Sequence, residues 1–374
     1  MKLSNPLILS VVLSLLSCTA WAQTKAEDKA KKDAERDVKL GKEYIVELEK
    51  GLKFSKDEAA IARVNTIGQE LAKIANAQTV KASYGDDRQF HFEYVFKVIE
   101  DKDVNAFSVP GGFIYVHSAL LDFVESDDEL AAVMAHEIAH AAHRHMNALV
   151  RERSKLDLAT LPLVLAALLG GSRDAGALII TQDLLKTALT NSWSQDAERD
   201  ADETGFYYLR ASGYSPTAML TFLERLAFRE NNSPNYNWGI ERTHPATRRR
   251  VNDLLKLLRT NNLPIQRSKV TTSFRTVATK VGEDYEVKFG NRLIVSFKGA
   301  SSNDRATLAV EQLNTFFDSN PQIFEVRVTG ETVIGRGRAL FSVTPTDGGQ
   351  NALDAAVKNL KNAIFSLSLR TAGG

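Results

Sequence analysis

The hydrophobic pattern of the first hundred residues predicts two helices followed by a small sheet. Residues 25–50 are charged with apolar positions at helical spacing, and residues 61–74 carry a fuller apolar series, so we expect a solvated helix followed by a packed one. Alternating aromatic and branched residues predict a strand from Phe90 to Ile99. Residues 105–116 have the pattern of a hairpin, with residues 110–112 (Pro-Gly-Gly) as its turn.

The pattern then becomes helical. Ser126 to Glu129 is typical of a capping box with acidic residues in the first turn, and it opens a helix that we expect to continue to about His145. Three more helices are expected, over Ser194–Leu209, Thr217–Arg229 and Pro245–Leu258. Residues 156–190 are unusually apolar, but neither apolar piece reaches the roughly 18 residues that a membrane span needs. We expect a helical hairpin that covers the domain, with contact at a membrane interface as the alternative.

Beyond residue 264 the pattern changes to short strands and helices. The expected strands are Val270–Ala278, Arg292–Phe297, Phe324–Thr329 and Ala339–Val343, and the expected helices are Ala306–Phe317 and Ala352–Leu367. This order predicts a small ββαββα-like domain, and it contains no histidine. No repeat with a period of about 20–50 residues is evident. The expected division of the chain is a signal peptide at 1–22, a first domain at 23–262 and a C-terminal α+β domain at 265–374.

Composition supports a globular protein with more than one core. The chain has 374 residues, of which 44% are hydrophobic and 25% are charged, and this length favours two domains. The 47 basic residues nearly balance the 46 acidic ones, which gives a formal net charge of +1. No overall electrostatic field therefore favours nucleic acid or an anionic membrane, and we expect no nucleic-acid partner.

The first 22 residues have the pattern of an export signal. Lys2 precedes a short apolar run over residues 7–16, and Ala20 and Ala22 place small residues at the two positions that a signal peptidase recognises. Cleavage after Ala22 would release a periplasmic or secreted protein without cysteine, because Cys18 is the only cysteine of the chain. The alternative is a lipoprotein that is anchored through Cys18.

The segment from His136 to His140 has the sequence His-Glu-Ile-Ala-His within the helix that Ser126 opens. Two histidines four residues apart lie on one face of a helix, and their imidazoles can bind one zinc ion. Glu137 would lie beside the metal, where it can take a proton from the attacking water and pass it to the leaving amine. The motif is typical of zinc metallopeptidases, and incidental surface histidines are the alternative.

A third metal ligand has to come from another part of the chain. His143 lies one turn beyond His140, but a straight helix cannot bring His136 and His143 to one ion, because seven residues span about 10 Å. We therefore expect His143 to lie next to the metal ligands without binding the ion, or at the surface. His145 is expected on the opposite face, buried or capping rather than bound to metal.

Glu198 is the better candidate for the third ligand. It shares one helical face with Asp202, next to the small residues Ala201 and Gly205, which allow close helix packing. Asp202 could then accept a hydrogen bond from a ligand imidazole and fix its tautomer. A solvated acidic helix face is the alternative for this charged segment.

Taken together, these motifs resemble the M48 metallopeptidases, a family that includes membrane prenyl-protein peptidases and periplasmic proteases of outer-membrane assembly. The resemblance covers roughly residues 36–258. The matching segments are Asn105-Ala106-Phe107 with Pro110-Gly111-Gly112, His136 to His140, Arg144-His145, Ser194 with Glu198, Ala201 and Asp202, and Thr243-His244-Pro245 with Arg250 and Val251. Gln195 and Asp200 depart from the usual Arg and Glu at positions that are not metal ligands. Residues 265–374 also lack the helical repeats of the outer-membrane assembly relatives.

The resemblance implies a mainly helical zincin-type (gluzincin) peptidase domain with a small β-sheet, and the smaller C-terminal domain makes the expected fold class α+β. It implies one Zn²⁺ per subunit, bound by His136, His140 and Glu198. It also gives His244 a role, either in hydrogen bonding the oxyanion or in occupying the open metal position and silencing the enzyme. Capping of the following helix is the alternative for His244. Arg250 is expected to point inward.

The expected function is therefore a zinc-dependent metalloendopeptidase that hydrolyses unfolded or misassembled envelope proteins. The strand within residues 106–116 can pair with an extended substrate backbone, which selects unfolded chain, and a purely structural strand is the alternative. A periplasmic chaperone or assembly factor with a latent zinc site is the competing class, and an intact Glu137 favours the enzyme. Besides the polypeptide substrate, a peripheral contact with a membrane or with outer-membrane assembly stays open.

Overall fold

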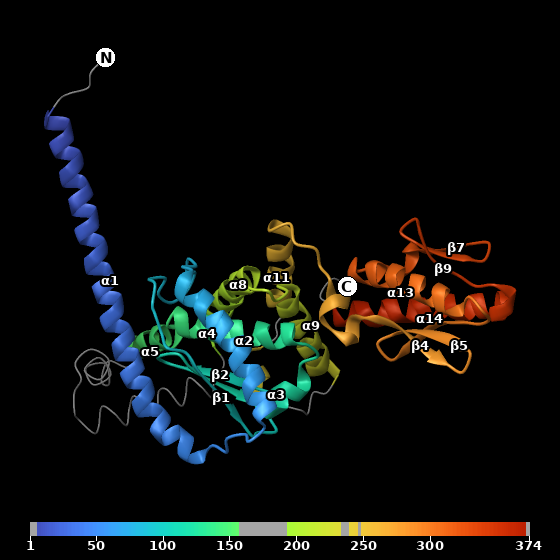
Figure 1. The fold of residues 1–374 in the computed structure, drawn as a ribbon, viewed down its shortest axis with the longest axis horizontal. Helices are drawn as coiled ribbons and strands as arrows, with labels where there is room; N and C mark the ends of the chain where they lie inside the picture. The colour runs from blue at the N-terminus through green and yellow to red at the C-terminus, as the bar shows by residue number, and fades with distance from the viewer. Residues whose placement is uncertain (1–5, 157–192, 233–238, 246–247, 372–374) are drawn as a thin grey trace.

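The computed structural model describes residues 6–156, 193–232, 239–245 and 248–371. The helices of the first part are α1 (Pro6–Leu48), α2 (Glu58–Ala77), α3 (Ser118–Phe123), α4 (Asp127–Ala142), α5 (His145–Leu156), α8 (Gln195–Ala211), α9 (Thr217–Asn232), α10 (Gly239–Thr243), α11 (Arg248–Thr260) and α12 (Arg267–Val270). Its strands are β1 (Val95–Ile99), β2 (Ala106–Val109) and β3 (Phe113–His117). Figure 1 shows α1 extending away from a mainly helical body, with a second body at the carboxyl end.

The small sheet confirms the predicted hairpin. Its strand order is β1-β3-β2, with β2 and β3 antiparallel and β1 and β3 parallel, so β2 is an edge strand. The predicted strand over residues 90–99 is wrong in its first half, because only β1 has strand pairing. The side chain of Asn76 on α2 instead binds the backbone of Phe92 through both its oxygen and its nitrogen, which replaces the strand partner there.

Helix α4 runs through the centre of the first body and is buried along nearly its whole length. Ser126 caps its first turn by accepting a hydrogen bond from the Glu129 backbone, as predicted, while the Glu129 carboxylate accepts from the Glu125 backbone instead of from Ser126. The expected continuation to His145 is wrong. The helix ends at Ala142, because Arg144 adopts a left-handed conformation with φ 54° and turns the chain into α5.

The expectation of a solvated first helix is also corrected. On α1, Ala30, Ala34 and Tyr44 are buried. Asp37 of the same helix accepts hydrogen bonds of 2.5 and 2.8 Å from the guanidinium of Arg144. Within the described residues, none of the helices has the length and apolar character needed to cross a membrane. The predicted signal cleavage and lipidation stay predictions, and the apolar segment 156–190 lies almost wholly outside the described residues.

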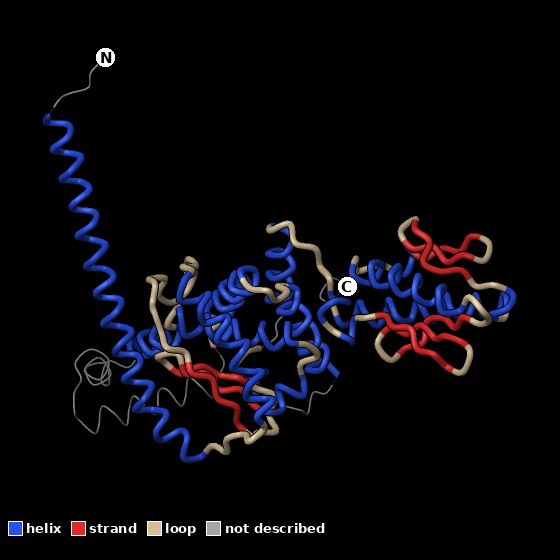
Figure 2. The backbone as a smooth tube through the Cα atoms, in the orientation of Figure 1, coloured by secondary structure: helices blue, strands red, loops and turns tan. Residues whose placement is uncertain are grey.

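The C-terminal body consists of two successive βββα units. Their elements are β4 (Thr276–Val281), β5 (Asp284–Phe289), β6 (Arg292–Phe297) and α13 (Ser302–Asp318), then β7 (Val326–Thr329), β8 (Thr332–Gly335), β9 (Arg338–Ser342) and α14 (Gly349–Arg370). Each unit forms an antiparallel sheet in sequence order, and Figure 2 shows the two sheets on either side of the helices. The predicted ββαββα order therefore missed β5 and β8, and the expected strand from Val270 begins only at Thr276.

The two bodies have separate hydrophobic cores, one drawn from residues 30–270 and one from residues 274–367. They meet through polar contacts: Asp318 on α13 accepts hydrogen bonds from the backbone (2.8 Å) and the hydroxyl (2.6 Å) of Ser268 on α12. Glu125, directly before α4, accepts hydrogen bonds from the backbone of Ser273 (2.7 Å) and the hydroxyls of Thr271 and Ser273. The predicted fold class is confirmed: a mainly helical zincin-type domain with a small sheet, followed by a smaller α+β domain.

Candidate metal centre

Three parts of the chain bring the four candidate ligands together in the middle of the first body. His136 and His140 lie on α4, Glu198 lies on α8, and His244 directly follows α10. The close approach of α8 to α4 depends on Gly205, because a Cβ there would lie 3.2 Å from the backbone nitrogen of His136. The sequence prediction of small residues at this helix contact is therefore consistent with the packing.

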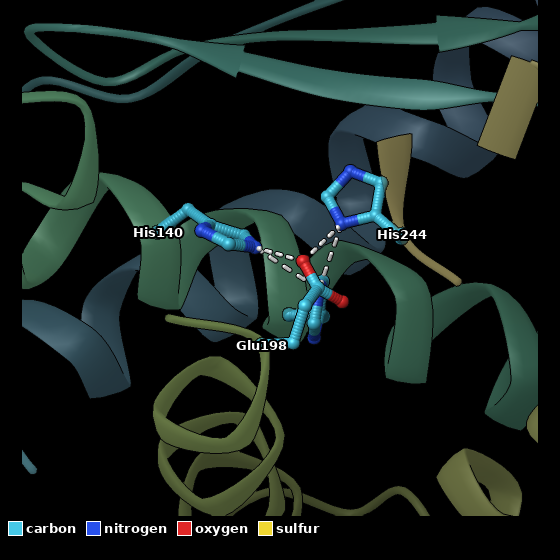
Figure 3. Close-up of side chains that lie close together, drawn as sticks. His140, Glu198 and His244 are labelled. Atoms are coloured by element: carbon cyan, nitrogen blue, oxygen red, sulfur yellow. Dashed lines mark hydrogen bonds and ion pairs between the residues drawn. The ribbon is translucent and has the colours of Figure 1, made fainter. Parts of the chain in front are cut away.

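The four side chains converge so closely that their ligand atoms all lie within 4.8 Å of one another. His136 Nε2 is 3.1 Å from His140 Nε2 and 3.2 Å from His244 Nδ1. Glu198 Oε1 is 2.8 Å from His244 Nδ1 and 3.4 Å from His140 Nε2. Figure 3 shows His140, Glu198 and His244 directed toward one point between the helices.

This donor set fits a zinc ion. Zinc prefers nitrogen and oxygen ligands in a tetrahedral array with Zn–N distances of about 2.0–2.1 Å, which separates two ligand nitrogens by about 3.3 Å. The nitrogen–nitrogen distances of 3.1 and 3.2 Å are close to that value. His136, His140 and Glu198 would supply three ligands, and His244 stands where a fourth would.

Glu137 lies beside this cluster and is 1% exposed. Its Oε1 is 3.4 Å from His244 Nε2, and its Oε2 has no hydrogen-bond partner among the described residues. Burial raises the pKa of Glu137, although the imidazoles of His244 and His136 and a hydrogen bond from Ser108 on β2 act in the opposite direction. A carboxylate with a raised pKa can both accept and return a proton near neutral pH.

Asp202 and Arg250 form a second layer around His136 and Glu198. Asp202 Oδ1 is 3.0 Å from His136 Nδ1. Arg250 donates hydrogen bonds of 2.7 and 2.8 Å to the Asp202 carboxylate, and its Nη1 is 2.5 Å from Glu198 Oε2. Arg250 therefore points inward as expected, and it compensates two buried carboxylates at once.

Burial and neighbouring charges shift the pKa values of the two histidines of α4 in opposite directions. Burial lowers the pKa of His136, but Glu198 and Asp202 outweigh it and raise the pKa to about 9. Burial dominates at His140 and holds its pKa well below the usual range. Burial would raise the pKa of Glu198, but Arg250 and the histidines keep it well below the usual range, so Glu198 is available as an anionic ligand.

Three side chains around His140 were not predicted to act at the site. The Trp193 ring stacks on the His140 ring with centroids 4.4 Å apart. His145 Nδ1 is 2.8 Å from His140 Nδ1, and His145 Nε2 is 2.9 Å from Asp200 Oδ2. His145 is buried as expected but not on the opposite face, because the left-handed Arg144 returns the chain toward His140. Helical periodicity could not predict the contact between His145 and His140, because that contact depends on the turn at Arg144.

His143 is buried, so the surface alternative for it is wrong. Its Nδ1 is 2.5 Å from Asp200 Oδ2 and its Nε2 is 3.1 Å from the Val80 carbonyl. It does not reach the four converging ligand atoms, as the length of the helix predicted.

Comparison with known proteins agrees with this geometry. Residues 62–258 match the model of the family described as Peptidase family M48. The chain is 28% identical over 347 residues to the Beta-barrel assembly-enhancing protease of Escherichia coli (strain K12), covering 88% of this chain and 66% of that protein, slightly less than two thirds of its length. It is 31% identical over 191 residues to the Metalloprotease LoiP of the same organism, covering 50% of this chain and 67% of LoiP.

A third relative matches a shorter part of the chain. The chain is 32% identical over 158 residues to the Mitochondrial metalloendopeptidase OMA1 of Saccharomyces cerevisiae, covering 41% of this chain and 43% of that protein. The family match includes all of His136, His140, Glu198 and His244 and covers more than half of the chain. The chain belongs to peptidase family M48.

Proposed function

We propose that this protein is a zinc-dependent metalloendopeptidase in which His136, His140 and Glu198 hold one zinc ion and Glu137 is the general base. The observation that carries the proposal is the convergence of these three ligands within one buried cluster, with Glu137 beside it. When bound, zinc would polarise the scissile carbonyl and increase the acidity of a water molecule.

Glu137 moves the proton in this mechanism. Its buried carboxylate takes a proton from the attacking water and later passes it to the leaving amine. The raised pKa of Glu137 suits both steps, because the group binds a proton more readily than an exposed carboxylate does. Asp202 orients the His136 ring through the 3.0 Å contact to Nδ1.

The substrate is an extended polypeptide that pairs with β2. This strand lies at the edge of the sheet, and Ser108 on β2 forms a hydrogen bond to Glu137. A substrate strand on this edge would pass beside the general base, and only unfolded or misassembled chain offers a free backbone for such pairing. The name of the Beta-barrel assembly-enhancing protease supports substrates among envelope proteins and a link to outer-membrane assembly.

The organisation of the chain follows the same proposal. Residues 1–22 serve as an export signal, residues 23–262 form the peptidase domain, and residues 265–374 form the C-terminal domain. The separate hydrophobic cores support two domains, although the first core extends to Val270 and the second begins at Phe274. Export would place the mature protein in the periplasm, with anchoring through Cys18 as the alternative.

The test of the activity is Glu137→Gln. The variant should bind one zinc per chain, as measured by elemental analysis, and lose essentially all hydrolysis of casein. Glu203→Gln on α8, which removes a carboxylate outside the cluster, is the matched control and should cleave like the wild type. Cleavage by Glu137→Gln at the wild-type rate would contradict the mechanism, and a wild type without stoichiometric zinc would contradict the site.

A self-inhibited assembly factor is the second candidate, and the position of His244 favours it. Its Nδ1 lies among the ligand atoms, 2.8 Å from Glu198 and 3.2 Å from His136, where it can occupy the position that substrate needs. His244→Ala separates the two functions: faster casein hydrolysis supports inhibition, whereas slower hydrolysis with unchanged zinc content supports a role of His244 in catalysis.

A further inference from the structure

The two histidines of the motif are supported by two different carboxylates of α8. His136 meets Asp202 directly, at 3.0 Å. Among the described residues, His140 has no direct carboxylate partner at Nδ1, but its Nδ1 is 2.8 Å from Nδ1 of His145, whose Nε2 is 2.9 Å from Asp200 Oδ2. A continuous chain of hydrogen bonds therefore joins His140 to Asp200 through one intervening imidazole.

The direction of this chain follows from the donors and acceptors. A neutral imidazole that offers the Nε2 lone pair to a metal carries its proton on Nδ1, so His140 donates to His145 Nδ1. His145 then carries its own proton on Nε2 and donates it to the Asp200 carboxylate. One arrangement of protons satisfies both rings, and it leaves His140 Nε2 free to face His136 Nε2 at 3.1 Å.

His145 is held in place from the opposite side by the loop that contains Tyr84 and Gly85. The Tyr84 ring meets the His145 ring edge-on with centroids 5.4 Å apart. Gly85 has φ 92°, and a Cβ there would lie 2.8 Å from Cδ2 of His145 and 2.2 Å from the His143 carbonyl oxygen. The Tyr84 backbone also donates to Asp200 Oδ1, at 3.1 Å. The loop thus fixes both the ring and the carboxylate that it bonds to.

We propose that His145 and Asp200 are positioning residues that fix the tautomer and ring orientation of His140 as a metal ligand. The inference rests on the proposed zinc site and deepens it, because it assigns the support of the second histidine to residues outside the ligand set. His143 reaches the same Asp200 oxygen, at 2.5 Å, but its other nitrogen bonds to the Val80 carbonyl, so the link between His140 and Asp200 runs through His145 and not through His143.

The test compares two variants in which a buried histidine is replaced by phenylalanine. His145→Phe removes the link between His140 and Asp200, whereas His143→Phe removes a buried imidazole from the same Asp200 oxygen without touching His140. We expect His145→Phe to weaken zinc binding by roughly 10–100-fold, the usual effect of removing the partner of a ligating histidine. His143→Phe should stay within about threefold of the wild type. The affinity is measured by competition with a chelator, on folded protein checked by circular dichroism.

Two further measurements keep the result independent of folding. His145→Gln can accept a hydrogen bond from His140 and donate one to Asp200, so it should recover most of the affinity. The visible absorption of the cobalt-substituted protein should change in His145→Phe and not in His143→Phe, because cobalt bands report the ligand geometry. Equal loss in both Phe variants, or wild-type affinity and spectrum in His145→Phe, would overturn the positioning role. A wild type that binds no zinc would overturn the proposed function as well, so the two failures are distinguishable.

Discussion

The first domain buries charged side chains beside its hydrophobic core, whereas the centre of the C-terminal domain is apolar. Between α4 and α8 the interior holds imidazoles, carboxylates and the guanidinium of Arg250, whereas the C-terminal core is made of aliphatic and aromatic residues such as Phe297 and Leu360. Buried charge costs free energy unless it is paired and hydrogen-bonded. We therefore attribute the buried charges of the first domain to the function of the site, and the apolar core of the C-terminal domain to the stability of the fold.

Arg250→Met should reduce the stability of the protein more than the other two substitutions below. The exchange leaves the carboxylates of Glu198 and Asp202 buried without their guanidinium partner, and removing one member of such a cluster costs about 3–5 kcal/mol. Chemical unfolding of the metal-free protein measures the loss. Added zinc should return part of it, because the cation compensates Glu198. Unchanged stability of the metal-free variant would contradict the role of Arg250.

Leu360→Ala should destabilise the apolar core of the C-terminal domain. Leu360 is fully buried in the C-terminal core, and its truncation costs about 3 kcal/mol. Zinc content and the turnover of casein should stay at wild-type values in conditions where the variant is folded. A loss of zinc binding in this variant would show that the two interiors are coupled through the domain junction.

Glu125→Gln should have the smallest effect and should depend on pH. Burial acts to raise the pKa of Glu125, but hydrogen bonds from Ser273 and Thr271 and the charge of Arg225 lower it to about 2. A carboxyl with a lowered pKa stabilises the fold above its unfolded pKa, and this contribution is lost as the pH falls toward the folded pKa. We expect the variant to lose about 1–2 kcal/mol at pH 7, and the difference from wild type to shrink between pH 4.5 and pH 2. A pH-independent difference would contradict this assignment.

The fold was predictable where periodicity is strong and local. The hairpin of β2 and β3, the cap at Ser126 and the helix after Ser194 follow from short patterns. The errors arose where tertiary contacts replace local rules. Side chains of α2 bind the backbone before β1, so no strand forms there, and a left-handed Arg144 ends α4 early. Short strands of four to six residues, such as β5 and β8, give too little alternation to detect.

The candidate site shows the same limit. The motif residues and Asp202 follow from spacing and resemblance, and the structure brings them together. Asp200 and His145 could not be found in this way, because their contact depends on the turn at Arg144 and on the packing of the loop around Gly85. A contact that depends on a turn and on loop packing leaves no regular interval in the sequence.

The position of His244 and Arg250 late in the first domain has a consequence for biosynthesis. His244 meets His136 across 108 positions of sequence, and Arg250 follows it. A growing polypeptide that has emerged only as far as α9 contains His136, Glu137, His140 and Glu198 but neither the late histidine nor the cation that compensates the carboxylates. The buried carboxylates of Glu198 and Asp202 therefore gain their guanidinium partner only after all the other members of the cluster have been synthesised.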